Sequence, residues 1–144
     1  MSVFHKGKEL TDAIIAMLTI GGLLVGDSEK PAGGGWQGAA GASTFVPYVD
    51  VWPTPGGIAD GDMARPFSDV EPDYIIRAFG ATRAQCEMVN DRVWQLMLSA
   101  NLTLIGRRVL LVSPEVLPGA VREDVGQPPV WYAPGRWRIM TTPG

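Results

Sequence analysis

Side chains that could act as acids, bases or nucleophiles are scarce in this 144-residue chain. His5 is the single histidine, and it precedes the first predicted helix. A Ser-His or Cys-His pair would therefore depend on a residue of the N-terminal tail, which is a poor position for a fixed catalytic base. Cys86, the single cysteine, falls on the apolar stripe of a predicted helix, where cysteine usually behaves as a small hydrophobic side chain. These residues predict that the chain is not an enzyme.

Acidic and glycine-rich stretches are present, but they do not complete a known binding pattern. Asp60 and Asp62 flank a glycine, yet the further oxygen ligands and the closing glutamate of an EF-hand are missing. The glycine run 33–35 lacks the lysine and the strand-to-helix setting of a phosphate-binding loop. The acidic groups at 69–73 and 123–124 could in principle serve glycoside hydrolysis, but they lie in predicted loops or at strand edges. We therefore expect no cofactor and no bound metal.

The charge balance argues against a general phosphate-binding surface. The formal net charge is −3 and the isoelectric point is near 5.0, so a polyanion finds little attraction. Arg107–Arg108 and the pair Arg136 and Arg138 are the local basic candidates. The longest apolar run, 13–25, is interrupted by polar and glycine residues and is too short to span a bilayer. We expect a soluble protein that binds neither membrane nor nucleic acid specifically.

The residues 81–100 predict the one long, capped amphipathic helix, around which the other elements must be arranged. Thr82 is in position to cap its N-terminus, and Gln85 can complete a capping box. A shorter amphipathic helix is predicted at 7–19. The apolar residues of the long helix recur at steps of three and four: Cys86, Val89, Val93, Leu96, Met97 and Ala100.

Strand-forming residues, β-branched and aromatic, dominate four further stretches. These are 44–52, 74–79, 107–113 and 130–142, with at most a short strand at 120–124. Pro134–Gly135 interrupts the last stretch, which fits either a hairpin or a bulged strand. Within it Trp137, Ile139 and Thr141 share one face, while Arg136, Arg138 and Met140 share the other.

Two helices of this size cannot cover both faces of a sheet. The elements therefore predict an α+β fold, a small mainly antiparallel sheet with two amphipathic helices packed on one face. We expect one domain over 1–144 with long loops at 26–43, 53–72 and 114–129, since a chain of this length is an ordinary single domain.

With no catalytic set in view, the candidate functional residues are interface residues. Tryptophan and arginine are frequent interface hot spots. Trp36 stands alone in the glycine-rich segment 26–43, where it either packs onto the edge of the core or anchors a partner. The further candidates are Trp52, Asp60, Asp62 and Arg65 in or beside the loop 53–72, and Arg136 and Trp137 in the last strand. For Trp52 and Trp137 a plain core position is an equal alternative.

Three stretches resemble a known family. They are PYVDVWPTPGG (47–57), DYIIRAFGATRAQCEMVNDRVWQLML (73–98) and PPVWYAPGRWRIMTTPG (128–144). The most distinctive feature is a strand YIIRAFG that runs directly into a helix opening with Thr-Arg-x-Gln. Together they resemble the tail terminator proteins, also called tail completion or neck proteins, of long non-contractile-tailed (siphovirus-type) bacteriophages, especially those that infect actinobacteria.

The resemblance implies a structural virion protein. Such proteins form a hexameric ring that caps the tail tube, ends polymerisation of the major tail tube protein and offers a joining surface to the head-tail connector or head-closure protein. It also implies assembly in the host cytoplasm and a place at the tail-neck junction of the virion. Genomic DNA passes through the lumen of such a ring without specific binding, so we expect acidic residues to outnumber basic ones there.

Other assignments stay open from the sequence. One is a tail-tube subunit, although such proteins are expected to be richer in strands and to have weaker helices. A head-closure or connector-ring protein of the phage neck is also a ring-forming structural protein. A small cellular ligand-binding α+β domain would instead need a concave apolar pocket.

Overall fold

The computed structural model describes residues 7–58, 70–116, 119–123 and 128–143. The two α-helices are α1 (Gly7–Ile20) and α2 (Arg83–Leu98). The strands are β1 (Val25–Asp27), β2 (Gly35–Trp36), β3 (Phe45–Val46), β4 (Tyr48–Ile58), β5 (Val70–Gly80), β6 (Arg107–Val116), β7 (Val121–Glu123) and β8 (Val130–Pro143).

Among the described residues, six strands form one sheet. Its order is β1-β4-β5-β8-β6, and β7 pairs with β8 on the same side as β6. The β1–β4 pair is parallel, and the other pairs of this sheet are antiparallel. A separate antiparallel pair joins β2 and β3. The predicted α+β class with a mainly antiparallel sheet is confirmed.

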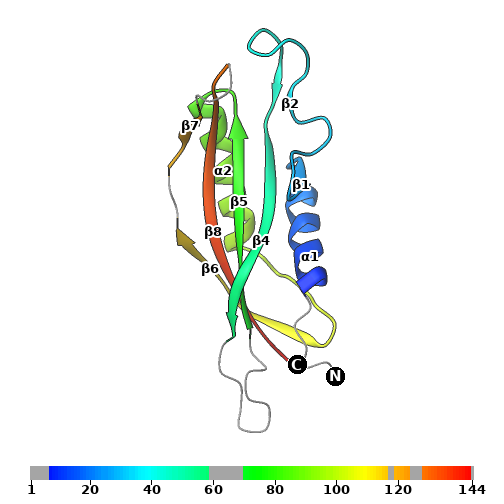
Figure 1. Ribbon diagram of the computed structural model, residues 1–144. Helices are drawn as coiled ribbons and strands as arrows, with labels where there is room; N and C mark the ends of the chain where they lie inside the picture. The colour runs from blue at the N-terminus through cyan, green and yellow to red at the C-terminus, as the bar shows by residue number, and fades with distance from the viewer. Residues whose placement is uncertain (1–6, 59–69, 117–118, 124–127, 144) are drawn as a thin grey trace.

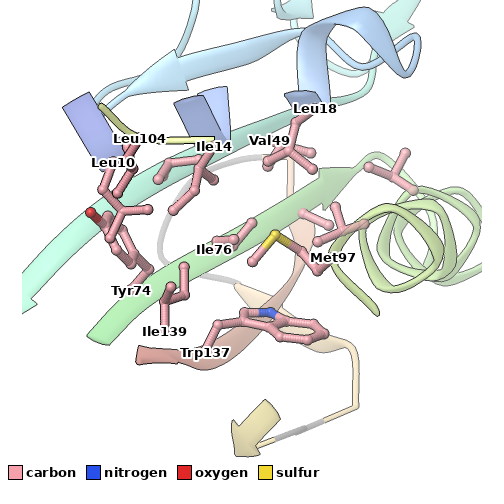
Figure 2. Close-up of a cluster of buried hydrophobic side chains, with 14 residues drawn as sticks. Leu10, Ile14, Leu18, Val49, Tyr74, Ile76, Met97, Leu104, Trp137 and Ile139 are labelled. Carbon is pink, nitrogen blue, oxygen red and sulfur yellow. The ribbon is translucent and has the colours of Figure 1, made fainter. Parts of the chain in front are cut away.

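Both helices pack on the same face of this sheet (Figure 1). α1 buries Leu10, Ile14 and Leu18, which are spaced by one helical turn. These side chains meet strand residues such as Val49 and Ile76 (Figure 2). α2 buries Cys86, Val89, Val93 and Met97. The predicted arrangement, two amphipathic helices on one face, is therefore confirmed, and one continuous core fills the space between them and the sheet.

The N-terminus of α2 is capped as the sequence predicts. The Thr82 hydroxyl oxygen accepts a hydrogen bond from the Gln85 backbone N–H at 3.2 Å. The Gln85 side chain in turn accepts one from the Ala81 backbone N–H at 2.8 Å. Gln85 thus reaches one residue further back than in the usual capping box, but it still satisfies a backbone donor ahead of the helix.

The central strands are longer than predicted. β4 continues to Ile58 and β5 begins at Val70, so both ends of the predicted loop 53–72 belong to a β-ladder. Pro53 fits into β4 because β1 pairs only with residues 49–51, which leaves that side of β4 open further along. The segments 26–43 and 114–129 also contain strand residues, namely those of β2 and β7 and the ends of β1 and β6.

The last strand runs through Pro134–Gly135 without forming a hairpin. β8 pairs with β5 along this stretch. On its other side β7 pairs with residues 130–132, and β6 pairs with residues 136–143. Pro134 falls in the gap between these two partners, where its missing N–H breaks no ladder hydrogen bond. The irregularities lie in β6 instead, where the register shifts twice.

Candidate protein interface on the uncovered sheet face

The face of the sheet opposite the helices carries a mixed polar and aromatic surface, here called the open face. Side chains alternate along each strand, so the residues between the core positions point to this face. Its members are Tyr48, Asp50 and Trp52 of β4; Asp73, Ile75, Arg77 and Phe79 of β5; Tyr132, Arg136, Arg138 and Met140 of β8; and Leu111 of β6.

Asp50 and Arg77 form the best-enclosed ion pair of the open face. Arg77 donates from Nε to one carboxylate oxygen of Asp50 at 2.9 Å and from Nη2 to the other at 2.6 Å. The Asp50 side chain is 3% exposed and that of Arg77 is 33% exposed. The guanidinium also lies over the rings of Trp52 and Phe79, at 5.4 and 5.0 Å from their centroids. Hydrogen bonding to Asp50 raises the pKa of Arg77 above its usual value.

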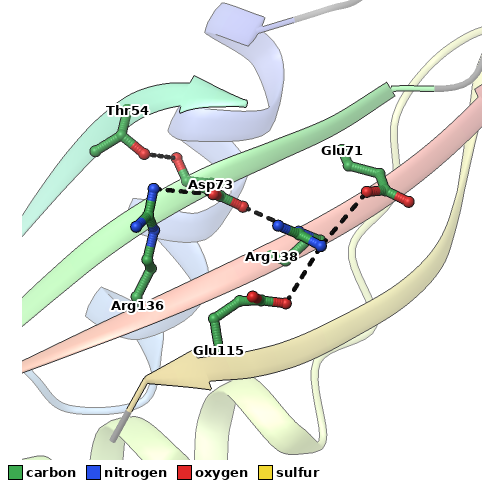
Figure 3. Close-up of polar contacts among 6 residues, drawn as sticks. All are labelled: Thr54, Glu71, Asp73, Glu115, Arg136 and Arg138. Atoms are coloured by element: carbon green, nitrogen blue, oxygen red, sulfur yellow. Dashed lines mark hydrogen bonds and ion pairs between the residues drawn. The ribbon is translucent and has the colours of Figure 1, made fainter. Parts of the chain in front are cut away.

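A second ionic network joins β5, β8 and β6 (Figure 3). Asp73 is nearly buried and lies between two arginines, with Arg136 Nη2 at 3.2 Å and Arg138 Nε at 3.3 Å. Arg138 also pairs with Glu71 at 3.7 Å and Glu115 at 3.5 Å. The hydrogen bond to Asp73 raises the pKa of Arg138. Among the described residues, Arg138 therefore has three carboxylate neighbours, whereas Arg136 has one, Asp73, which it shares with Arg138.

Stacked aromatic rings cross the same face at the end nearer the glycine-rich segment. Tyr48 stacks on Phe79 with ring centroids 4.6 Å apart, and Phe79 faces Tyr132 at 6.0 Å. The row continues from Tyr48 to Phe45, on which Trp36 packs edge-on at 5.1 Å. Such pairs stabilise beyond the area they bury. They fix the β2–β3 pair to the main sheet.

The glycine-rich segment makes close backbone contact with this row. A β-carbon at Gly34 would lie 3.0 Å from the ring of Tyr48, so the glycine permits the approach. Trp36 is half-buried, and its indole N–H is buried without a hydrogen-bond partner among the described residues. The contact of Trp36 with Phe45 agrees with the alternative in which Trp36 packs onto the edge of the core.

An open groove of about 320 Å³ lies over β4 and β5 on the open face. Its lining residues are Trp52, Pro53, Thr54, Ile75 and Arg77. Trp52 is 38% exposed, which is high for the largest apolar side chain. Aromatic residues, methionine and arginine are enriched at protein interfaces, and lysine is depleted. The open face has the aromatic residues, methionine and arginine of this composition, and its two aspartates are held in ion pairs, so it is the best candidate interface of the described chain.

The described residues were compared with three kinds of feature: a metal-binding cluster, a reactive thiol and a membrane-spanning helix. No cluster of three or more His, Cys, Asp or Glu side chains able to hold a metal occurs among them. Cys86 is buried, and burial raises the pKa of its thiol to about 11, which keeps it protonated and unreactive at neutral pH. In the part of the chain that the structure describes, no helix has the length and apolar character needed to cross a membrane.

A virion protein shares this fold. A chain from the virion of a native gene transfer agent (GTA) particle superposes with a TM-score of 0.61 at 17% sequence identity. The match covers 96% of this chain and 98% of the other, so the two have the same extent. No family model matches the sequence. No curated protein matches it either.

Apart from Trp36, described above, the sequence-predicted interface residues fall into three groups in the structure. Trp52 and Arg136 lie on the open face, where they flank Ile75 in the cross-strand register. Trp137 is 1% exposed and packs against Trp94 in the core, so it has no surface to offer a partner and follows its core alternative. Asp60, Asp62 and Arg65 lie outside the described residues.

The sequence did not connect the residues that organise the open face. Asp73 and Arg138 were seen only as members of an acidic and a basic group, and Arg77 lies in the predicted strand 74–79, whose other residues are apolar or aromatic. A period-two pattern was available as a signal, because Asp73, Ile75, Arg77 and Phe79 alternate with core residues along β5. The partners of these residues lie on other strands, so the ion pairs themselves had no signal in local spacing.

Proposed function

We propose that this chain is a structural virion protein, a tail terminator that forms a hexameric ring on the end of a phage-type tail tube. The observation that carries the proposal is the fold shared with a chain of a gene transfer agent virion over nearly the full length of both chains. The resemblance of 47–57, 73–98 and 128–144 to tail terminators adds to it. One tail-terminator-like domain would then span 1–144.

In this role the ring ends polymerisation of the major tail tube protein and presents a surface to the head-tail connector or head-closure protein. Both contacts and the contacts between subunits are protein interfaces, for which no catalytic group or cofactor is needed. The open face, with Trp52 and Arg136 on it, is a surface suited to one of them. The protein would be made in the host cytoplasm and end at the tail-neck junction.

The DNA that passes through the ring must not be held by it. Free arginines would attract phosphates. Each arginine of the open face is instead paired with a carboxylate: Arg77 with Asp50, and both Arg136 and Arg138 with Asp73. This internal pairing supports a protein that meets DNA without binding it specifically.

A head-closure or connector-ring protein of the neck is the second candidate function, because the fold shared with a virion chain is compatible with either structural role. The two assignments differ in their first partner. A terminator binds the end of the tail tube, whereas a head-closure protein binds the connector on the capsid.

Tube polymerisation tests the proposal. The major tail tube protein of the same virus is polymerised with and without this chain, and tube lengths and ends are recorded by negative-stain electron microscopy. A terminator stops growth and leaves a visible cap at one end of each tube. Unchanged tube lengths with bare ends, together with binding to purified connectors, would assign the chain to head closure instead.

A further inference from the structure

An apolar groove of about 450 Å³ lies beside α1, on the helical side of the molecule. The segment that follows α2 runs toward α1 and forms part of its wall (Figure 1). The apolar lining residues are Ala13, Ala16, Met17 and Ile20 of α1, together with Leu96 and Leu102. This groove is separate from the open face, which lies on the other side of the sheet.

The α1 wall of the groove is a second apolar stripe on that helix. Ala13, Ala16, Met17 and Ile20 are joined by steps of three and four residues. At 3.6 residues per turn, the stripe is rotated by roughly a third of a turn from the residues that α1 buries against the sheet. Ile20 is 86% exposed and Ala16 is also exposed. The described part of the chain therefore leaves this stripe open to a packing partner.

The two ends of the stripe carry opposite charge. Glu9 lies one helical turn before Ala13 and continues the stripe at its N-terminal end. At the C-terminal end, Arg92 of α2 donates to the Gly21 carbonyl from Nε at 3.2 Å and from Nη2 at 3.0 Å. Its Nη1 donates to the side-chain oxygen of Gln95 at 3.2 Å. Among the described residues Arg92 contacts no carboxylate, so its positive charge is available to one.

We propose that α1 of one copy of the chain packs antiparallel on α1 of a second copy, across a two-fold axis level with residues 15–16. Glu9 and Gly21 lie at about equal distances on either side of this axis, so Glu9 of each copy meets Arg92 of the other. Ile20 of each copy enters the groove of the other beside Ala13. The surface selects a second copy because it is complementary to itself: when it is reversed, its protruding end meets its small residues and its acidic end meets its basic end.

The physical features of the stripe favour this contact. Alanines at the centre let two helix axes approach to about 8 Å. Antiparallel helices also bring the positive end of each helix dipole to the negative end of the other. The same surface is used by both copies, so the contact is isologous and closes as a pair. The inference concerns the free protein and goes beyond the proposed function, because a pair formed through α1 leaves the open face uncovered.

Sedimentation equilibrium of the free protein over a concentration series tests the contact. Wild type is expected to form a dimer of the 15.5 kDa chain. Ala16→Lys places two like charges at the axis and raises the dissociation constant at least about tenfold. Thr19→Lys, at an exposed residue of α1 outside the groove, leaves it unchanged. Circular dichroism verifies the fold of both variants. A monomeric wild type, or equal effects of the two substitutions, would overturn the proposal.

Cross-linking tests the symmetry. In a Cys86→Ala background, Ala16→Cys is treated with a short bismaleimide, and Thr19→Cys serves as the matched control. Because residue 16 lies near the axis, Ala16→Cys gives covalent dimers and no larger species, whereas Thr19→Cys stays monomeric. A ladder of multimers from Ala16→Cys, or equal yields from both variants, would exclude the two-fold arrangement.

Charge reversal tests the ends of the contact. Arg92→Glu and Glu9→Arg each weaken dimerisation, and the double variant restores it. Arg92→Glu also removes the contact with Gly21 within its own chain. The second substitution cannot replace that contact, so the rescue reports on the pair between copies. Dimerisation that is no stronger in the double variant than in the single ones would contradict the proposed pairing.

The contact and the proposed function fail separately. Free wild type that dimerises through α1 but never caps tubes retains the contact and rejects the terminator. Free wild type that stays monomeric but caps tubes retains the terminator and rejects the contact. If the free protein is monomeric and Ala16→Lys abolishes binding to tubes or connectors, the groove takes another virion protein and the second copy is excluded as its occupant.

Discussion

The carboxylate of Asp50 is almost fully buried, and Arg77 donates to both of its oxygens. Replacing it by asparagine leaves the guanidinium between two aromatic rings without its counter-charge. Breaking a buried pair from one side is strongly destabilising, and partial exposure of Arg77 reduces the cost. We expect Asp50→Asn to lower the free energy of unfolding by about 2–3 kcal/mol, measured by urea denaturation.

The matched control for this variant is Glu87→Gln, which breaks the exposed Arg83–Glu87 pair of α2. Exposed pairs of this type contribute at most about 0.5 kcal/mol. The double variant Asp50→Asn with Arg77→Gln should recover part of the loss, because no unpaired charge remains. Equal small effects of Asp50→Asn and Glu87→Gln would contradict the account of the open face.

Burial of Cys86 gives a prediction about alkaline pH. Its thiol donates to the Ala78 carbonyl at 3.4 Å, and burial raises its pKa from 9.0 to about 11. A raised pKa in the folded state means that this contribution to stability is complete below pH 9 and is lost as pH rises toward 11. Two pKa units correspond to at most about 2.7 kcal/mol.

The check is the free energy of unfolding at pH 8 and pH 10.5 for wild type and Cys86→Ala. Wild type loses more stability than the variant over this range, because only wild type carries the Cys86 thiol. Burial also raises the pKa values of Tyr48 and Tyr74, but it does so in both proteins and cancels in the comparison. The native thiol should also react slowly with a maleimide at pH 7. Rapid labelling of folded protein would show that Cys86 is accessible.

Among the secondary-structure elements, α2 has an N-cap whose contribution to the free energy of unfolding can be tested with a single substitution. Thr82→Ala removes the acceptor for the Gln85 backbone N–H. Loss of such a cap costs about 1 kcal/mol, and we expect that decrease in thermal or urea unfolding experiments. Thr103→Ala, at an exposed threonine outside both helices, is the control and should change stability little. A cost for Thr82→Ala no larger than that of Thr103→Ala would contradict the capping role.

The helices and the sheet class could be predicted because their signals are local. The steps of three and four in 86–97 and the alternation in 136–141 determine which side chains are buried, and the cap at Thr82 determines where α2 begins. The strand limits could not be predicted from the same signals. Whether Pro53 or Pro134 ends a strand depends on which neighbours pair beside it, and that is a property of the sheet.

The candidate site was only partly predictable for the same reason. Trp52 and Arg136 were predicted from residue type, but their environment depends on Asp50, Arg77 and Asp73, which come from other strands or other positions. Trp137 shows that residue type can also suggest an interface where the structure has a core position. Its residue type fits an interface equally well, and only the packing of α2 against β8 places it in the core.

In the whole molecule, as far as the structure describes it, both helices lie on one face of the sheet and no helix lies on the other. A sheet with helices on a single side has a second face on which a further layer can pack. The uncovered side carries Trp52 and a network of ion pairs (Figure 3). This asymmetry is the feature that a ring of identical subunits would use, since each copy can present different surfaces to its two neighbours.

The tail-terminator assignment is tested by the mass and symmetry of the protein bound to tail tubes. Light scattering is recorded for the protein alone and after mixing with tubes, and the tube ends are then averaged from negative-stain images. We expect a sixfold ring at the tube end, six copies of the 15.5 kDa chain. A protein that stays monomeric at high concentration and leaves the tube ends bare would contradict it.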